Sequence, residues 1–288
     1  MTQASHNSRP LPPSPGFSTI RFEKRGTLAW IKLNRPRQLN AYNVAMRDDL
    51  FGALSAVHDD PEVRAMVLSG AGPAFSTGGD VSEFGTAPSP TVARWVRFRR
   101  DVWGRLRALP IPTVAAVHGY AVGGGLEMVL LCDIAIAASD AKFCLPETGL
   151  GMIPGVAGTQ TAARRLGPGR ALDLCITGRW IDAKEALAIG LVAEVVPGAT
   201  LMRAAGALAR GLCRLPRERV AMAKLAVWDG LELPLSEALA MERRLARRFD
   251  NLSRAAISAP KRAPRGRPEE TKHREHRQFH QHPGLDCP

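Results

Sequence analysis

Three consecutive glycines, Gly123 to Gly125, follow a buried apolar run and open a helical pattern, and they constrain the fold more than any other feature of the chain. Glycines without side chains let a backbone approach a ligand closely. The first amides of a helix lack partners within it and lie at its positive end, so Gly124 can present an N–H group to a developing negative charge. The sequence therefore predicts one half of an oxyanion hole at this helix start.

A second glycine-bearing loop follows another short apolar run. The run Ala65 to Leu68 leads into a loop that contains Gly78 and Gly79 and ends at Asp80. Both loops follow buried strands and both offer backbone amides, so we expect them to meet at one edge of a sheet and to hold a single oxygen atom between them.

Two glutamates accompany these loops. Glu127 lies in the first turn of the helix that the glycines open, and Glu147 is the only charged residue between Lys142 and Arg164. A carboxyl group buried in such an apolar stretch has a raised pKa, which suits a general acid at neutral pH. Each glutamate also has a simpler interpretation, as a surface residue at a helix start or in a loop. Two carboxyl groups beside two amide donors fit the addition or removal of a proton next to a carbonyl group.

The remaining pattern predicts an α/β core followed by a helical region. We expect a β-hairpin over residues 18–33 and a helix over residues 43–59. Three buried strands follow at residues 65–68, 113–117 and 134–137, with helices at residues 91–109, 124–131, 159–166, 170–176 and 183–189. We divide the chain into a flexible leader (1–16), an α/β core (17–199), a helical C-terminal region (200–250) and a basic tail without regular structure (251–288).

Charge leaves two classes of function open. The chain has 288 residues, 45% of them hydrophobic, and a net charge of +12, so it is long enough for a large core and strongly basic. Such a charge attracts nucleic acid, but it equally attracts an anionic small-molecule substrate. Six arginines crowd the expected helix at 91–109 and form a candidate RNA-binding stripe, although a solvated face is the simpler interpretation. They are Arg94, Arg97, Arg99, Arg100, Arg105 and Arg107, and we expect Trp95, Phe98, Trp103 and Leu106 of the same stretch to lie in the core.

Composition also suggests a compartment. Five cysteines without paired spacing indicate reduced thiols. The first sixteen residues hold four prolines and no apolar stretch, and no later run resembles a membrane span, so we expect a cytoplasmic protein. The tail carries a group that could gather a metal ion, but a solvated tail is the simpler interpretation. That group is His273, His276, His280, His282 and Cys287.

Several blocks, in order, resemble the enoyl-CoA hydratase and isomerase, or crotonase, superfamily. The resemblance runs from about Phe17 to Phe249. It rests on the blocks Leu33-Asn-Arg-Pro-Arg-Gln-Leu-Asn-Ala41, Phe75-Ser-Thr-Gly-Gly-Asp80, Gly119-Tyr-Ala-Val-Gly-Gly-Gly-Leu-Glu127, Cys132-Asp-Ile-Ala-Ile136 and Pro154-Gly-Val-Ala-Gly-Thr-Gln160. It implies a crotonase-like spiral of repeated ββα units with a helical C-terminal region.

The resemblance also implies an activity. The amides of Gly79 and Gly124 would hold the thioester oxygen of an acyl-CoA, and losing one such donor typically costs roughly 2.7–4 kcal/mol of barrier. Hydratases of the family carry glutamates at the positions of Glu127 and Glu147. Glu127 would act as the base while water attacks Cβ, and Glu147 would handle the proton at Cα. This implies an enoyl-CoA hydratase of fatty acid metabolism. Isomerase, lyase, decarboxylase or thioester hydrolase chemistry on an acyl-CoA is the alternative.

Binding and assembly follow from the same resemblance. Coenzyme A would be cradled by Asn40 and Ala41 and by Asp80, Val81 and Ser82, with basic residues nearby for its phosphates. No metal or redox cofactor is implied, coenzyme A being part of the substrate. The family forms trimers or dimers of trimers. The residues do not specify the acyl group.

Two features depart from the family pattern. Ala157 stands where the family usually has another glycine, which would reshape the pocket near the catalytic water. The segment after Asn251 also differs from the family's usual C-terminal helix, which helps to close the acyl site and to pack the trimer.

Overall fold

The computed structural model describes residues 16–258 of the chain. The chain separates into a unit that ends at Ala246 and a second unit from Arg247 onward. The elements described below belong to the first unit, except for the end of the last helix. The expected leader lies almost entirely outside the described residues, and so do the histidines of the expected tail.

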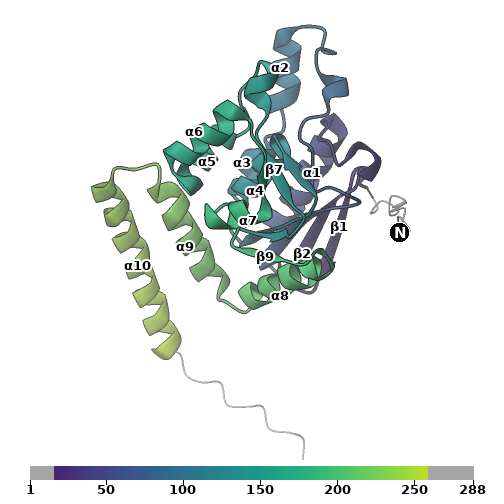
Figure 1. Cartoon of the computed structure of the whole chain (residues 1–288). Coiled ribbons are helices and arrows are strands. Elements are labelled where there is room, and N and C mark those ends of the chain that lie inside the picture. The colour runs from purple at the N-terminus through teal and green to yellow at the C-terminus, as the bar shows by residue number, and fades with distance from the viewer. Residues whose placement is uncertain (1–15, 259–288) are drawn as a thin grey trace, which may run out of the picture. The chain divides into compact units, whose positions relative to one another are not determined.

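The larger sheet has six strands in the order β1-β2-β3-β4-β6-β9 (Figure 1). The first two pair as an antiparallel hairpin, and every other neighbouring pair is parallel. The hairpin and the three buried strands are therefore confirmed. The strands are β1 (Ile20–Arg25), β2 (Leu28–Leu33), β3 (Ala65–Gly70), β4 (Thr113–Val117), β6 (Ile134–Ala138) and β9 (Glu194–Val196).

A smaller sheet joins β5 (Tyr120–Val122), β7 (Lys142–Cys144) and β8 (Ile181–Asp182) in the order β5-β7-β8. These strands are too short to give a periodic signal, and the sequence analysis missed them. After β4 the chain crosses to β5 and enters helix α4 (Gly124–Leu131), and after β6 it crosses to β7 and leads on to helix α5 (Gly158–Leu166). This repetition of ββα units confirms the expected spiral α/β fold.

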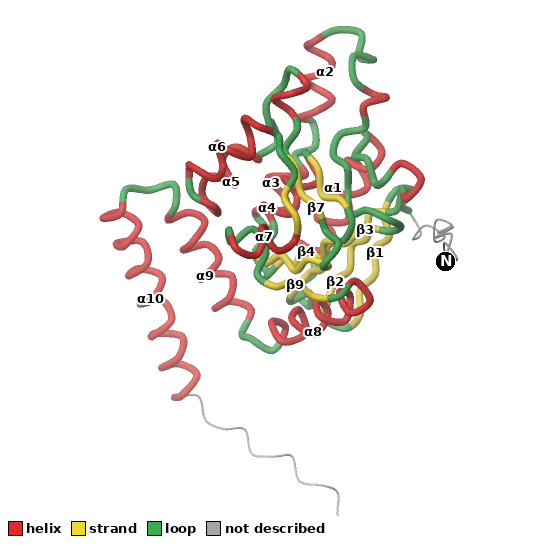
Figure 2. Tube along the Cα trace, in the orientation of Figure 1, coloured by secondary structure: helices red, strands yellow, loops and turns green. Residues whose placement is uncertain are grey.

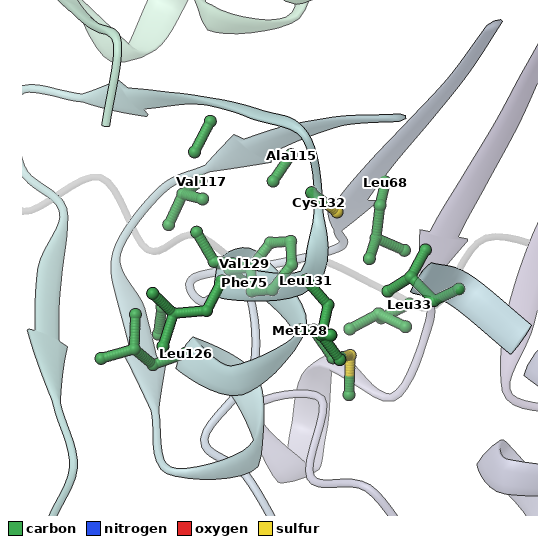
Figure 3. Packing of buried hydrophobic residues seen from close by; sticks show 14 of the residues in the cluster. Leu33, Leu68, Phe75, Ala115, Val117, Leu126, Met128, Val129, Leu131 and Cys132 are labelled. Carbon is green, nitrogen blue, oxygen red and sulfur yellow. The ribbon is translucent and has the colours of Figure 1, made fainter. Parts of the chain in front are cut away.

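Helices cover both faces of the larger sheet (Figure 2). Alternate strand residues face opposite ways, so Val67 and Val114 pack with α8 in one cluster while Leu68 and Ala115 belong to the main core. Figure 3 shows that core, with side chains of β3 and β4 beside those of α4. The other helices are α1 (Val44–Asp59), α2 (Pro90–Phe98), α3 (Val102–Arg107), α6 (Pro168–Thr177), α7 (Ala183–Ala188), α8 (Leu201–Cys213), α9 (Arg217–Gly230) and α10 (Leu235–Ser258).

Two expected elements differ in the structure. The single helix at 91–109 is divided into α2 and α3, because the Asp101 side chain accepts a hydrogen bond from the Gly104 amide at 2.8 Å and caps a new helix start. Residues 251–258 continue α10, so the expectation of no regular structure from residue 251 is wrong for them. They contain no proline, and alanine, leucine and arginine favour a helix there.

Two further findings concern the described part of the chain as a whole. Between residues 16 and 258, no helix has the length and apolar character needed to cross a membrane. The four cysteines of the same range carry free thiols, buried at Cys132 and Cys144 and half-buried at Cys175 and Cys213.

Candidate active site

The loop that ends at Asp80 is held between two other segments. The Tyr42 amide donates to the Gly78 carbonyl at 2.7 Å, and the Asp80 amide donates to the Tyr42 carbonyl at 2.9 Å. In such a parallel bridge the residue between the two bonded groups directs its own N–H away from the partner segment. The Gly79 amide therefore points away from Tyr42.

The loop lies directly against the start of α4. A Cβ atom on Gly78 would lie 2.7 Å from the Val122 carbonyl oxygen and 3.1 Å from the Gly124 nitrogen. A Cβ atom on Gly124 would lie 3.8 Å from the Gly79 nitrogen. Gly124 is the first residue of α4, so its N–H has no acceptor within the helix. The structure thus brings together the two amides that the sequence analysis selected.

Glu127 is buried, with 1% of its surface exposed, in the first turn of α4. Its Oε1 accepts hydrogen bonds from the amides of Val156 at 3.0 Å and Gly158 at 2.7 Å. A Cβ atom on Gly124 would lie 3.9 Å from its Oε2. One carboxylate oxygen is thus held by the loop before α5, and the other lies beside the glycines.

Glu147 begins the short helix η3 (Glu147–Leu150), which follows β7 and Pro146. Its Oε2 is buried and has no hydrogen-bond partner in the described part of the chain. A Cβ atom on Gly123 would lie 2.5 Å from its Oε1, so a side chain there would displace the carboxyl group. Burial raises the pKa of Glu147, and a weaker backbone hydrogen bond within the residue opposes this shift.

The two glutamates belong to one site. Burial raises the pKa of the Cys175 thiol on α6, and the charges of Glu147 and Glu127 raise it further. Gly123 contacts Glu147, and the adjacent Gly124 lies near Glu127. Two carboxyl groups and two amide donors therefore surround one point at the start of α4.

The residues expected to bind coenzyme A lie close to these glycines, and their side chains make different contacts. The Asn40 side chain is fully buried, and its Nδ2 donates to the carbonyls of Ala71 and Ala74, so it holds the loop together from inside. Asp80 accepts from Ser82 Oγ at 2.6 Å and from Arg35 at 2.8 Å, and hydrogen bonds from Ser82, then Arg35, lower its pKa.

The residues expected to bind coenzyme A also include Val81 and Ala41, one with an exposed side chain and the other with contacts through its backbone. Val81 is exposed at the surface. The Ala41 carbonyl accepts a hydrogen bond from the Arg35 guanidinium, and the Ala41 amide donates to the Gln38 carbonyl.

Backbone groups are what the sequence analysis missed. The amides of Val156 and Gly158 bind Glu127, and neither residue was selected from the sequence. Nearly every residue has a backbone amide, so the sequence does not indicate which amides bind a side chain. The Pro154-Gly-Val-Ala-Gly158 block was the one available signal, through the family resemblance.

The arginines of the expected stripe are spread over α2, α3 and the residues between them, and those whose side chains are described have local partners. Arg100 pairs with Asp48 and lies over Phe51, while Arg107 contacts Glu232 and Trp228. The side chain of Arg97 lies outside the described residues.

The aromatic residues of the same stretch divide in a similar way. The core prediction holds for Leu106, which is buried, and Trp103 packs against the core. It is wrong for Trp95 and Phe98, which are 58% and 57% exposed. They lie on α2, where Arg99 stacks on Trp95 and Arg94 on Phe98.

The fold and this geometry define an α/β protein of ββα repeats whose glycine loops and paired glutamates form one site. The family model for enoyl-CoA hydratase/isomerase matches residues 23–260. The chain belongs to the enoyl-CoA hydratase/isomerase family.

Named relatives agree with this assignment. A probable enoyl-CoA hydratase of Mycobacterium tuberculosis is 40% identical over 232 residues, covering 80% of this chain and 88% of the relative. A short-chain-enoyl-CoA hydratase of Clostridium acetobutylicum is 38% identical over 78% of this chain and 87% of the relative. A crystal structure of an enoyl-CoA hydratase from Bacillus anthracis is similar with a TM-score of 0.76 and 34% identity, covering 83% of this chain and 96% of that one.

Proposed function

We propose that the protein is an enoyl-CoA hydratase that adds water across the double bond of a 2-enoyl-CoA thioester. The observation that carries this proposal is the convergence of Glu127 and Glu147 on the glycines that offer the Gly79 and Gly124 amides. Relatives named as enoyl-CoA or crotonyl-CoA hydratases support it at 35–40% identity.

The geometry suggests a role for each group. The thioester oxygen would accept hydrogen bonds from Gly79 and Gly124, which stabilise the enolate that forms as Cβ is attacked. Glu127 would take a proton from a water molecule while the oxygen of that water bonds to Cβ. Glu147 would give a proton to Cα, which completes the addition of one water molecule. The proton held by Glu127 would pass back to Glu147 through solvent before the next turnover. The raised pKa of Glu147 suits a proton donor at neutral pH.

Further parts of the proposal come from the resemblance. The residues around Ala41, Asp80 and Ser82 would bind coenzyme A, with no metal or redox cofactor. We propose a homotrimer or a dimer of trimers, acting in fatty acid metabolism in the cytoplasm.

The test is the loss of enoyl thioester absorbance with crotonyl-CoA. We expect turnover by the wild type and a loss on the order of 10²–10⁴-fold in Glu127→Gln and in Glu147→Gln, since each removes one proton-transfer group. Glu194→Gln, which changes an exposed glutamate on β9, is the matched control and should keep full activity.

The opposite result is also informative. A wild type that binds acetyl-CoA but leaves crotonyl-CoA unchanged would contradict hydration of simple enoyl groups. Assays for isomerase, lyase and thioester hydrolase activity would then follow, because each uses the same thioester site.

A further inference from the structure

Ala157 has a backbone conformation that residues with side chains rarely adopt. Its φ is +112° and its ψ is −11°, immediately before α5 begins at Gly158. A left-handed conformation is unfavourable for an L-residue, because Cβ approaches the following carbonyl oxygen. Such strain persists only where the surrounding structure imposes it, and it often marks a functional position.

The residues on either side of Ala157 show what this conformation achieves. The amides of Val156 and Gly158 both point at Glu127 Oε1, at 3.0 and 2.7 Å. Amides this close in sequence point to the same acceptor when the residues between them form a turn with a left-handed member. With an extended conformation at Ala157, the amides of Val156 and Gly158 would lie too far apart to donate to a single oxygen.

The two amides fix the orientation of the Glu127 carboxylate. They occupy Oε1, so Oε2 is directed to the side where Gly124 lies. The glycine at position 158 allows this close approach, because a Cβ atom there would lie only 2.7 Å from Oε1. Two backbone donors on one oxygen also stabilise the ionised form of a carboxyl group, the form that a general base needs.

Helix α5 holds the other end of α4 as well. The Arg165 guanidinium donates to the carbonyls of Val129, Cys132 and Asp133, at and just after the end of α4. The start of α5 thus hydrogen-bonds to Glu127 in the first turn of α4. The last turn of α5 hydrogen-bonds to the end of α4. The turn at Ala157 is therefore built into a fixed pair of helices.

We propose that Ala157 is a positioning residue for the hydration reaction, and that its left-handed backbone aims the Val156 and Gly158 amides at Glu127. This rests on the proposed function, since Glu127 must be the base. The family's usual glycine adopts this conformation without strain. In this chain an alanine directs the two amides at Glu127, and its backbone is strained.

Substitutions at Ala157 test the proposal, because a positioning role should change kcat and leave KM nearly unchanged. A β-branched residue tolerates positive φ least, so we expect Ala157→Val to turn the two amides away and to lower kcat on the order of 10²-fold. The KM for crotonyl-CoA should stay within about twofold, since the residues proposed to bind coenzyme A lie on other segments. Ala157→Gly should keep the wild-type kcat.

Gly190→Val is the matched control. Gly190 has φ +80° just after α7, and a Cβ atom there would meet no atom within 4 Å. The substitution adds the same kind of strain away from the glutamates, so it should lower the melting temperature as Ala157→Val does while leaving kcat unchanged. An Ala157→Val enzyme with wild-type kcat, or a Gly190→Val enzyme with an equal loss, would overturn the proposal.

Hydrogen exchange tests the same contact without any turnover. The Val156 and Gly158 amides should exchange on the order of tenfold faster in Ala157→Val and in Glu127→Ala than in the wild type, as seen by mass spectrometry of a peptide covering 154–160. Unchanged exchange in both variants would contradict the contact. If the wild type fails to hydrate crotonyl-CoA but exchange rises in both variants, the hydratase proposal fails while the positioning of Glu127 stands.

Discussion

Glu127 and Glu147 are the same side chain in two different surroundings. Two amides donate to Glu127, whereas Glu147 has a buried oxygen without a partner in the described part of the chain and a pKa raised by burial. Hydrogen bonds from amides and burial act in opposite senses on a carboxyl group, so these surroundings support the proposed roles of Glu127 as base and Glu147 as acid. The surroundings therefore distinguish two residues of the same type.

The raised pKa of Glu147 predicts how stability depends on pH. The native state keeps this proton above the ordinary value of about 4.5, at which the unfolded chain releases it. The native state then binds more protons, so this residue makes the free energy of unfolding fall as pH rises from about 4.5 through the raised pKa. Glu147→Gln lacks this titration, so its stability relative to the wild type should increase over that window and then level off.

Urea denaturation of both proteins at a series of pH values measures this difference, with Glu194→Gln as the control. A difference between wild type and Glu147→Gln that stays constant with pH would show that burial does not perturb this carboxyl group.

Helix α9 is attached to the rest of the first unit by polar contacts. It has no buried residue, but Lys224 Nζ donates to Asp133 Oδ2 at 2.9 Å and to the Ile111 carbonyl at 3.1 Å. Trp228 Nε1 donates to Asp133 Oδ1, and Asp133 Oδ2 also accepts from Thr113 at the start of β4. One aspartate after α4 thus joins a strand of the main sheet to a helix of the C-terminal region.

We therefore expect Lys224→Met to lower the free energy of unfolding by about 1.5–3 kcal/mol, the contribution of a hydrogen bond to a charged group. The side chains of the pair are only 9% and 18% exposed, so solvent screens it weakly. Urea denaturation gives the value, and Lys184→Met, at an exposed position of α7, should change it little. Equal midpoints for the two variants would show that the pair does not hold α9 in place.

At the scale of the whole molecule, large apolar side chains remain at the surface of the single chain. Leu172 and Ile176 are exposed one turn apart on α6, and Trp180 follows them in an edge-on contact with Tyr120. Contiguous exposed apolar residues often mark a surface that another protein covers. This fits the proposed assembly of several copies.

The proposed trimer predicts a mass in solution. Light scattering after size-exclusion chromatography should give about three times, or six times for a dimer of trimers, the 31.1 kDa of one chain. We expect the same mass across a tenfold range of protein concentration, because an obligate assembly does not dissociate on modest dilution. A mass of one chain throughout would contradict the trimer.

The sequence by itself determined which segments form the main strands and most of the helices. Apolar runs at 65–68, 113–117 and 134–137 are long enough to show a buried strand, and the glycines beside them mark where the backbone makes close approaches. The residues themselves pointed to both glutamates and both glycine loops, and the resemblance to the family assigned their expected roles. Local composition and the order of motifs can be seen in the sequence without knowledge of the fold.

The tertiary structure alone decided how the site is held together. Val156 and Gly158 contribute only amides, and Ala157 contributes only a backbone angle, so none of the three carries a side-chain signal. Packing likewise left Trp95 exposed although its helical spacing had suggested the core. The position of a backbone group in space depends on how distant segments pack, and packing is a property of the folded chain that no local stretch of sequence contains.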